Sequence, residues 1–360
     1  MPVSETPYLR LGRECPEYSW WRLPVGLVAG FAVYIVLTIG VVIATVVVFA
    51  GVSAEGLVED FFADDLSTDN PWLLGLLLLS VAIWLPGQLL GRFACGPRLG
   101  DLMSVEGRLR VRWLLVCSAI AFVLYGGAIG LAALLDDDPS PVRMDGNAWL
   151  VIAVALVVVP FQATAEEVVF RGQLMQMVGA WTRWAWVPVV VSTPLFVAGH
   201  AYDLWGLIDV GVFGLLAALL TIRTGGLEAA MAAHVANNVV LFAVDAMGLY
   251  AATGTDYGPI DVLPTVVVSL LMAGAVEIAF RRGGLRRTRP RLPDPPPKVH
   301  YPFPPAAYYP PPTAWVPDPR WTPVPQPPHQ PVPVPVPQAP EPRGDYPTYP
   351  GEIPDDWGRR

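Results

Sequence analysis

The chain has 360 residues, of which 53% are hydrophobic and only 15% are charged, and it contains 13 Trp residues. This balance is far from that of a soluble globular protein, so it excludes an ordinary soluble domain and favours a lipid environment. The formal net charge of −8 says little about partners in such a chain, because the positions of the charges matter more. We expect no nucleic-acid partner.

The N-terminal segment, residues 1–22, is polar and carries Arg10, Arg13 and Arg22. An apolar run follows, from Leu23 to Gly51. The h-region of a signal peptide is about 7–15 residues long and ends at a small-residue cleavage site, whereas this run is long enough to cross a bilayer. We therefore expect a first transmembrane helix here and no cleaved signal peptide.

Further apolar runs follow along the chain, and the pattern predicts an all-α, polytopic membrane protein with about eight transmembrane helices. The expected spans are residues 23–51, 72–91, 113–135, 148–179, 184–201, 206–222, 226–248 and 260–280. Lys and Arg fall on alternate loops, while the loops at Glu55–Asp69 and Asp136–Asp138 are acidic. The positive-inside rule then places both termini in the cytoplasm and the acidic loops outside, in what we expect to be a bacterial plasma membrane.

Composition divides the chain into four parts. These are a cytoplasmic segment (1–22), the first three helices (23–147), a core of helices four to eight (148–282) and a Pro-rich tail (283–360). Proline removes backbone donors and fixes φ, so the tail is expected to be disordered with polyproline II character, either as a solvated spacer or as a ligand for a cytoplasmic partner. Cys15, Cys95 and Cys117 are expected to be free thiols.

The fourth apolar run contains charged residues, in the sequence Glu166-Glu167-Val168-Val169-Phe170-Arg171. A charge at the bilayer centre costs about 2.5–3.5 kcal/mol on insertion scales, so such a group indicates a functional site. On a helix Glu167 and Arg171 are one turn apart and can pair. Glu166 points about 100° away from Glu167 and is left available for chemistry.

Two histidines lie in later apolar runs, His200 in the fifth and His234 in the seventh. Arg183 lies midway in the sequence between Glu166 and His200, so an antiparallel hairpin that turns there would bring these two side chains level. His234 and Asn238 are at positions i and i+4 and share one helix face. A carboxylate, two imidazoles and an amide could together form a hydrolytic site.

The three motifs Glu166-Glu167-x-x-x-Arg171, Phe196-x-x-x-His200 and His234-x-x-x-Asn238 resemble, in order, those of the CPBP (ABI) family of intramembrane proteases. That family includes the type II CAAX prenyl endopeptidases and bacteriocin-immunity-type proteins. The resemblance covers residues 148–248. It implies an endopeptidase, often classed as a metalloprotease, that hydrolyses a peptide bond of a membrane-associated protein or peptide.

Carried over by position, the resemblance implies that Glu166 and His200 activate water and that His234 and Asn238 stabilise the oxyanion. Glu167 and Arg171 would brace the helix. No metal cofactor is favoured, because the sequence lacks His-Glu-x-x-His and Asn238 is a poor zinc ligand. A zinc-dependent form of the same protease would use Glu166, His200 and His234.

A non-catalytic scaffold or a transporter is the alternative from another class, since buried Glu and His also relay protons or grip partners. The polar residues gather in the second half of the chain without a matching set in the first half. Inverted repeats of a transporter would predict such a set.

Overall fold

The computed structural model describes residues 5–14, 18–49, 70–95, 98–134, 142–249 and 258–291, and helices make up most of this part of the chain. Both expected acidic loops, Cys15 and nearly all of the Pro-rich tail lie outside the described residues. The helices are α1 (Arg22–Phe49), α3 (Pro71–Ala82), α4 (Trp84–Ala94), α5 (Gly100–Met103), α6 (Val111–Leu134), α7 (Gly146–Glu167), α8 (Met175–Trp181), α9 (Trp186–Val197), α10 (Leu204–Thr224), α11 (Glu228–Ala246) and α12 (Val262–Arg282). Two helical segments of other types, η1 (Tyr8–Glu14) and η2 (Val168–Leu174), and two short strands, β1 (Glu5–Pro7) and β2 (Thr288–Pro290), complete them.

Within the described residues, seven helical segments are long and apolar enough to cross a membrane, which confirms the predicted polytopic helical architecture. The fifth predicted span is the exception. Its residues form only the 12-residue helix α9, preceded by the turn at Arg183 and followed by a loop from Ala198 to Asp203. A helix of that length is about 18 Å long, too short for a hydrocarbon core of about 30 Å.

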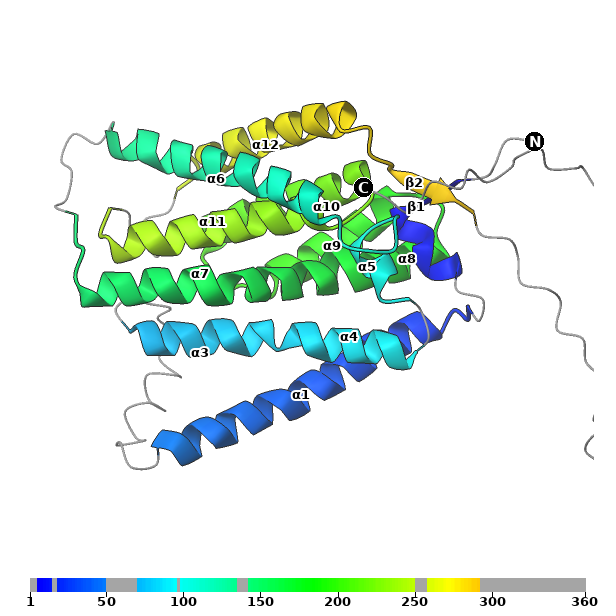
Figure 1. Cartoon of the computed structure of the whole chain (residues 1–360), viewed down its shortest axis with the longest axis horizontal. Helices are drawn as coiled ribbons and strands as arrows, with labels where there is room; N and C mark the ends of the chain where they lie inside the picture. The colour runs from blue at the N-terminus through cyan, green and yellow to red at the C-terminus, as the bar shows by residue number, and fades with distance from the viewer. Residues whose placement is uncertain are drawn as a thin grey trace, which may run out of the picture. The chain divides into compact units, whose positions relative to one another are not determined.

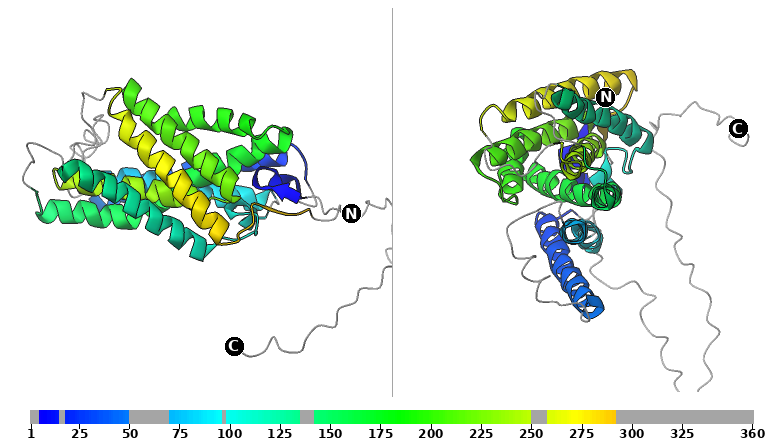
Figure 2. Two further views of the ribbon diagram at one scale, coloured as in Figure 1. Left: turned by 90° about the horizontal axis from the view of Figure 1, so that it is seen from above. Right: turned by 90° about the vertical axis from the view of Figure 1, so that its left-hand side faces the viewer.

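Helix α7 runs through the middle of the bundle (Figure 1). It packs against α11 on one side and against α3 and α4 on the other, while α6 covers α11 and in turn contacts α12. Helix α10 contacts α9, α11 and α12. The left view of Figure 2 shows α12 (yellow) beside α10 (green). The core between α6, α9, α10, α11 and α12 is built largely from small and aromatic side chains. They include Phe196, Phe213 and four alanines of α11 that are 0% exposed. Close packing of this kind holds α6, α10, α11 and α12 together, with Phe196 of α9 in the same cluster.

Helices α7, η2 and α8 form one continuous helical segment of 36 residues, Gly146–Trp181. At 1.5 Å per residue it is about 54 Å long, so it exceeds one bilayer crossing, as the sequence predicts. Its middle, η2, is a π-helix that begins directly after Glu167. The Oγ of Ser192 donates to the carbonyl of Phe170 at 2.9 Å, which satisfies a group within this wider turn. Such π-segments are rare and concentrate at functional sites.

One end of the bundle gathers η1, the two strands, α5 and the start of α11, and we call it the β end. Strand β1 pairs antiparallel with β2, with Thr6 opposite Arg289, so both ends of the described chain meet here. The guanidinium of Arg289 binds Glu14 (Nε–Oε2, 2.7 Å) and Asp101 (Nη1–Oδ1, 2.7 Å). The pair of strands was not predicted from the sequence, because three-residue strands carry too little pattern to detect.

A buried ion pair also closes the β end. Arg110 binds Glu228 through two bonds, Nε–Oε1 at 2.9 Å and Nη2–Oε2 at 2.7 Å, and its Nη1 donates to the carbonyl of Thr224 at 3.1 Å. Glu228 begins α11 three residues after Gly225, which caps α10 with a φ of +67°. This pair therefore fixes the turn that sets the position of α11, and with it His234.

Candidate functional site

The site is built on the last turns of α7, the first three turns of α11, and the aromatic side chains of α9 and α10. Charged and polar groups there are almost completely removed from solvent. Exposed fractions are 8% for Glu166, 0% for Glu167, 1% for Arg171 and 3% for His234. Burial of unpaired charge is costly, so each group is expected to have a partner.

Glu167 and Arg171 form the predicted ion pair, with Arg171 Nη1 2.9 Å from Glu167 Oε1. The same carboxylate oxygen lies 2.9 Å from Nδ1 of His234. Arg171 also donates from Nη2 to the carbonyl of Gly214 at 3.2 Å, and its Cζ lies 4.1 Å above the ring of Phe196. The contacts of Glu167 and Arg171 thus extend beyond their own helical segment to α9, α10 and α11. The contact of Glu167 with His234 was not predicted from the sequence.

His234 is held in a defined tautomer. A carboxylate only accepts hydrogen bonds, so the Nδ1 that faces Glu167 carries the hydrogen and the neutral ring keeps a lone pair on Nε2. That Nε2 lies 3.7 Å from Oε2 of Glu166. This distance is too long for a direct hydrogen bond. The two acceptor atoms therefore lie close together without a hydrogen bond between them.

A chain of three amides leads to the other oxygen of Glu166, and only the first of them bonds it. Gln162 donates from Nε2 to Glu166 Oε1 at 2.5 Å, Asn238 donates to Gln162 Oε1 at 3.3 Å, and Asn237 donates to Asn238 Oδ1 at 3.0 Å. Each amide donates towards the carboxylate, an orientation that stabilises its charged form. The sequence analysis missed Gln162, although the i, i+4 spacing to Glu166 that revealed the Glu167–Arg171 pair applies equally to it.

His200 does not make the predicted contact with Glu166: no hydrogen bond or ion pair joins these two described residues. Helix α9 ends at Val197, so His200 lies on a loop and the equal-distance argument for a helical hairpin does not reach it. Its Nδ1 lies 2.9 Å from the carbonyl of Phe196, and its ring stacks on that of Tyr202 with centroids 6.0 Å apart. A carbonyl is an acceptor, so His200 also keeps its lone pair on Nε2.

The residues named for a zinc site do not gather into a three-ligand set. Among the described residues no group of three His, Cys, Asp or Glu side chains is placed to hold a metal ion. Glu166 Oε2 and His234 Nε2 lie 3.7 Å apart, but neither of these described residues forms a hydrogen bond or ion pair with His200. The two described cysteines, Cys95 and Cys117, are free thiols, as predicted.

Fold and site together define an integral membrane protein of the polytopic helical class, with a polar site enclosed between helices near the β end. Residues 147–240, which contain every residue of this site, match the family described as type II CAAX prenyl endopeptidase Rce1-like. The family resemblance predicted from the three motifs is thereby confirmed for this segment.

A curated relative is similar to part of the chain. The uncharacterized protein YyaK of Bacillus subtilis (strain 168) is 33% identical over 141 residues, which make up 35% of this chain and 47% of that protein. The chain thus spans about half the length of the curated relative it matches. No solved structure matches the chain.

Proposed function

We propose that this protein is an intramembrane endopeptidase that hydrolyses a peptide bond of a membrane-associated protein or peptide. The observation that carries the proposal is the approach of Glu166 Oε2 to His234 Nε2, which lie 3.7 Å apart. Oε2 is buried without a hydrogen-bond partner in the described part of the chain. One water oxygen at about 2.8 Å from both atoms fits this separation.

Such a water donates one hydrogen to Glu166 and the other to His234, so its lone pairs face outward towards a substrate carbonyl. Glu166 takes the proton as the oxygen attacks the carbonyl carbon. The C–N bond of the tetrahedral intermediate then breaks, and the protonated Glu166 returns the proton to the leaving nitrogen. Glu167 contributes by holding the tautomer of His234 that accepts from the water.

Asn238 is the donor proposed for the oxyanion. One hydrogen of its Nδ2 is directed to Gln162, which leaves the second for a substrate oxygen. His234 moves in this proposal from the oxyanion role to the orientation of water. His200, on the loop after α9, is proposed to contact the substrate or the leaving group through Nε2.

The proposed mechanism uses no metal. Zinc in catalytic sites takes three protein ligands, and His200 is not assembled with Glu166 and His234. We therefore derive no step through a metal ion, and the reaction rests on the carboxylate, the imidazole and the amides.

For the substrate we propose a peptide held at the membrane, and the description of the matching family points to a prenylated C-terminal peptide. We also propose that the protein lies in a bacterial plasma membrane with the β end in the cytoplasm, so that water and substrate enter from that side. The Pro-rich tail, which lies almost wholly outside the described residues, would then be available to a cytoplasmic partner.

The test is capture of substrate by a Glu166→Gln variant in native membranes, followed by mass spectrometry of what co-purifies. We expect an uncleaved membrane protein or peptide that is retained by this variant and cleaved by the wild type. Glu106→Gln, which removes a carboxylate from a loop outside the site, is the control and should retain nothing. A retained molecule that the wild type leaves intact would point instead to a non-catalytic scaffold.

A further inference from the structure

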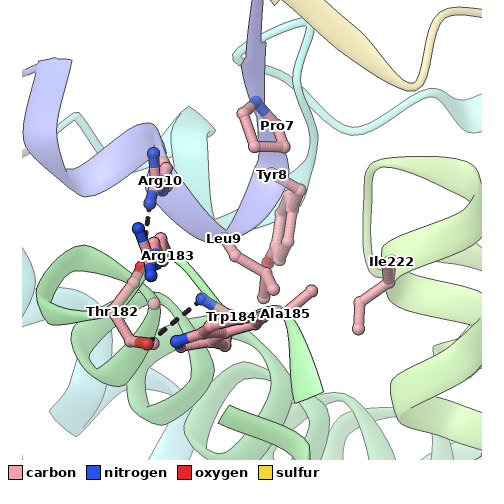
Figure 3. A pocket seen from close by; sticks show the side chains of 10 residues that line it. Pro7, Tyr8, Leu9, Arg10, Thr182, Arg183, Trp184, Ala185 and Ile222 are labelled. Atoms are coloured by element: carbon pink, nitrogen blue, oxygen red, sulfur yellow. Dashed lines mark hydrogen bonds between the residues drawn. The ribbon is translucent and has the colours of Figure 1, made fainter. Parts of the chain in front are cut away.

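A second polar feature lies at the β end, away from the Glu166 site. It is an open cavity with a volume of about 80 Å³ between η1 and the turn that joins α8 to α9. Arg10 and Arg183 lie together on one side, with Trp184 below them and Ile222 on the opposite side (Figure 3). Leu9 contributes a further apolar wall.

The two guanidinium groups pair with no acidic side chain among the residues that the structure describes. Arg10 donates from Nη2 to the carbonyl of Thr182 at 3.0 Å, and the Cζ of Arg183 lies 5.0 Å from the ring centroid of Trp184. A guanidinium has five N–H donors, so most of the donors of this pair are left for a ligand. Two adjacent like charges without a carboxylate form a site for an anion.

The positions of the exposed Trp side chains indicate the depth of this cavity in the membrane. Five Trp side chains at the β end are 46–68% exposed, and they are Trp20, Trp21, Trp181, Trp184 and Trp186. At the starts of α3 and α7, on the other side of the bundle, Trp72 is 71% and Trp149 is 59% exposed. Exposed Trp residues gather at the two membrane–water interfaces. The cavity, lined by Trp184, therefore lies at the level of the lipid headgroups.

We infer that this cavity binds the phosphodiester of an anionic phospholipid headgroup. Arg10 and Arg183 contact the phosphate oxygens, which guanidinium groups recognise with paired hydrogen bonds. Leu9 and Ile222 face the glycerol and the first carbons of the acyl chains. The bound lipid joins η1 to the α8–α9 turn, so it holds the loop ends of two helices that form the Glu166 site.

Binding is measured on the full-length protein in detergent, by titration with short-chain phosphatidylglycerol, short-chain phosphatidylcholine and inorganic phosphate. We expect phosphatidylglycerol to bind more tightly than the other two. Arg10→Gln and Arg183→Gln should each weaken its binding about fivefold, as expected for loss of one basic residue near an anionic surface.

Arg282→Gln is the matched control, because it removes an exposed Arg at the same end of the bundle outside the cavity. It should leave the affinity unchanged. If the Arg10→Gln variant fails to fold because it loses its bond to Thr182, binding by the Arg183→Gln variant alone tests the inference, since Arg183 is exposed. Equal weakening by Arg282→Gln, equal binding of phosphatidylcholine, or inorganic phosphate binding as tightly as phosphatidylglycerol would overturn the inference.

Discussion

Glu166 and Glu167 are adjacent in the sequence, yet their side chains meet different partners because successive residues on a helix point about 100° apart. Oε1 of Glu167 is shared by Arg171 of η2 and His234 of α11. Glu166 faces the amide of Gln162 on one side and Nε2 of His234 on the other. We therefore propose that Glu167 has a structural and orienting role and that Glu166 holds water.

This division can be tested by removing each charge separately. Arg171→Ala leaves Glu167 buried without its cation, and loss of one member of a buried pair costs roughly 3–5 kcal/mol. We expect a much lower unfolding temperature and folding yield. Glu166→Gln keeps the size of the side chain and should unfold within a few degrees of the wild type while losing turnover. Equal destabilisation of both variants would reject the division.

The roles of the amides that lead to Glu166 can also be tested by substitution. Asn238→Ala removes the proposed oxyanion donor, and such a loss typically lowers kcat by about 10²–10³. Gln162→Leu removes the bond that positions Glu166 and should also lower kcat, with little change in KM. Steady-state kinetics on a captured substrate measures both. A Gln162→Leu variant that raised KM alone would assign this amide to substrate binding instead.

Sequence reasoning at the residue scale succeeds where partners share a helix. The i, i+4 rule predicts the Glu167–Arg171 pair, and it places His234 and Asn238 on the same face. It fails for His200, because its position depends on where α9 ends. The hydrogen bond from Arg171 to the carbonyl of Gly214 cannot be predicted from the sequence, since every residue has a backbone carbonyl.

At the scale of elements, the contact of α1 with α4 depends on glycines. Gly26 and Gly30 of α1 face Gly87 and Gly91 of α4, and a Cβ on Gly91 would lie 2.4 Å from the carbonyl oxygen of Gly26. Small residues four apart let helix backbones approach closely in membranes. Few side chains of α1 are buried inside the protein, with 6% of its apolar window buried. The helix is therefore attached mainly through this crossing.

A pair of substitutions on α1 tests this contact. A Cβ on Gly30 would lie 2.5 Å from Gln88 Oε1, whereas a Cβ on Gly40 would meet nothing within 4 Å. Gly30→Ala should destabilise the protein by about 1–3 kcal/mol through overpacking. Gly40→Ala should be neutral or slightly stabilising, because Ala is the better helix former. Thermal unfolding in detergent compares them, and equal effects would show that the crossing is not tightly packed.

Hydropathy predicts the long helices well, since each of α1, α6, α10, α11 and α12 is a single apolar run bounded by polar residues. It overestimates α9 because apolar residues continue into the loop after Val197, and length alone cannot locate a helix end inside such a run. The π-segment η2 is likewise invisible to hydropathy. Its wider turn changes hydrogen bonding without changing which residues are apolar.

At the scale of the whole molecule, both ends of the described chain are tied together by β1, β2 and Arg289. Truncation after Arg291 keeps the strand pair and the bonds of Arg289 to Glu14 and Asp101. Truncation after Gly284 removes them. We expect the first variant to retain the stability and turnover of the full-length protein and the second to unfold at a lower temperature. Loss of turnover by the longer, folded variant would show that the Pro-rich tail takes part in the reaction.

We propose that Glu166 activates a water molecule for peptide hydrolysis without a metal. This proposal is tested most directly by cleavage of the captured substrate in H₂¹⁸O, using protein dialysed against a chelator. We predict that the wild type cleaves and places one ¹⁸O in the new carboxyl group, while Glu166→Gln yields no product. Cleavage by Glu166→Gln, or activity that disappears on dialysis and returns in proportion to bound zinc, would contradict the account.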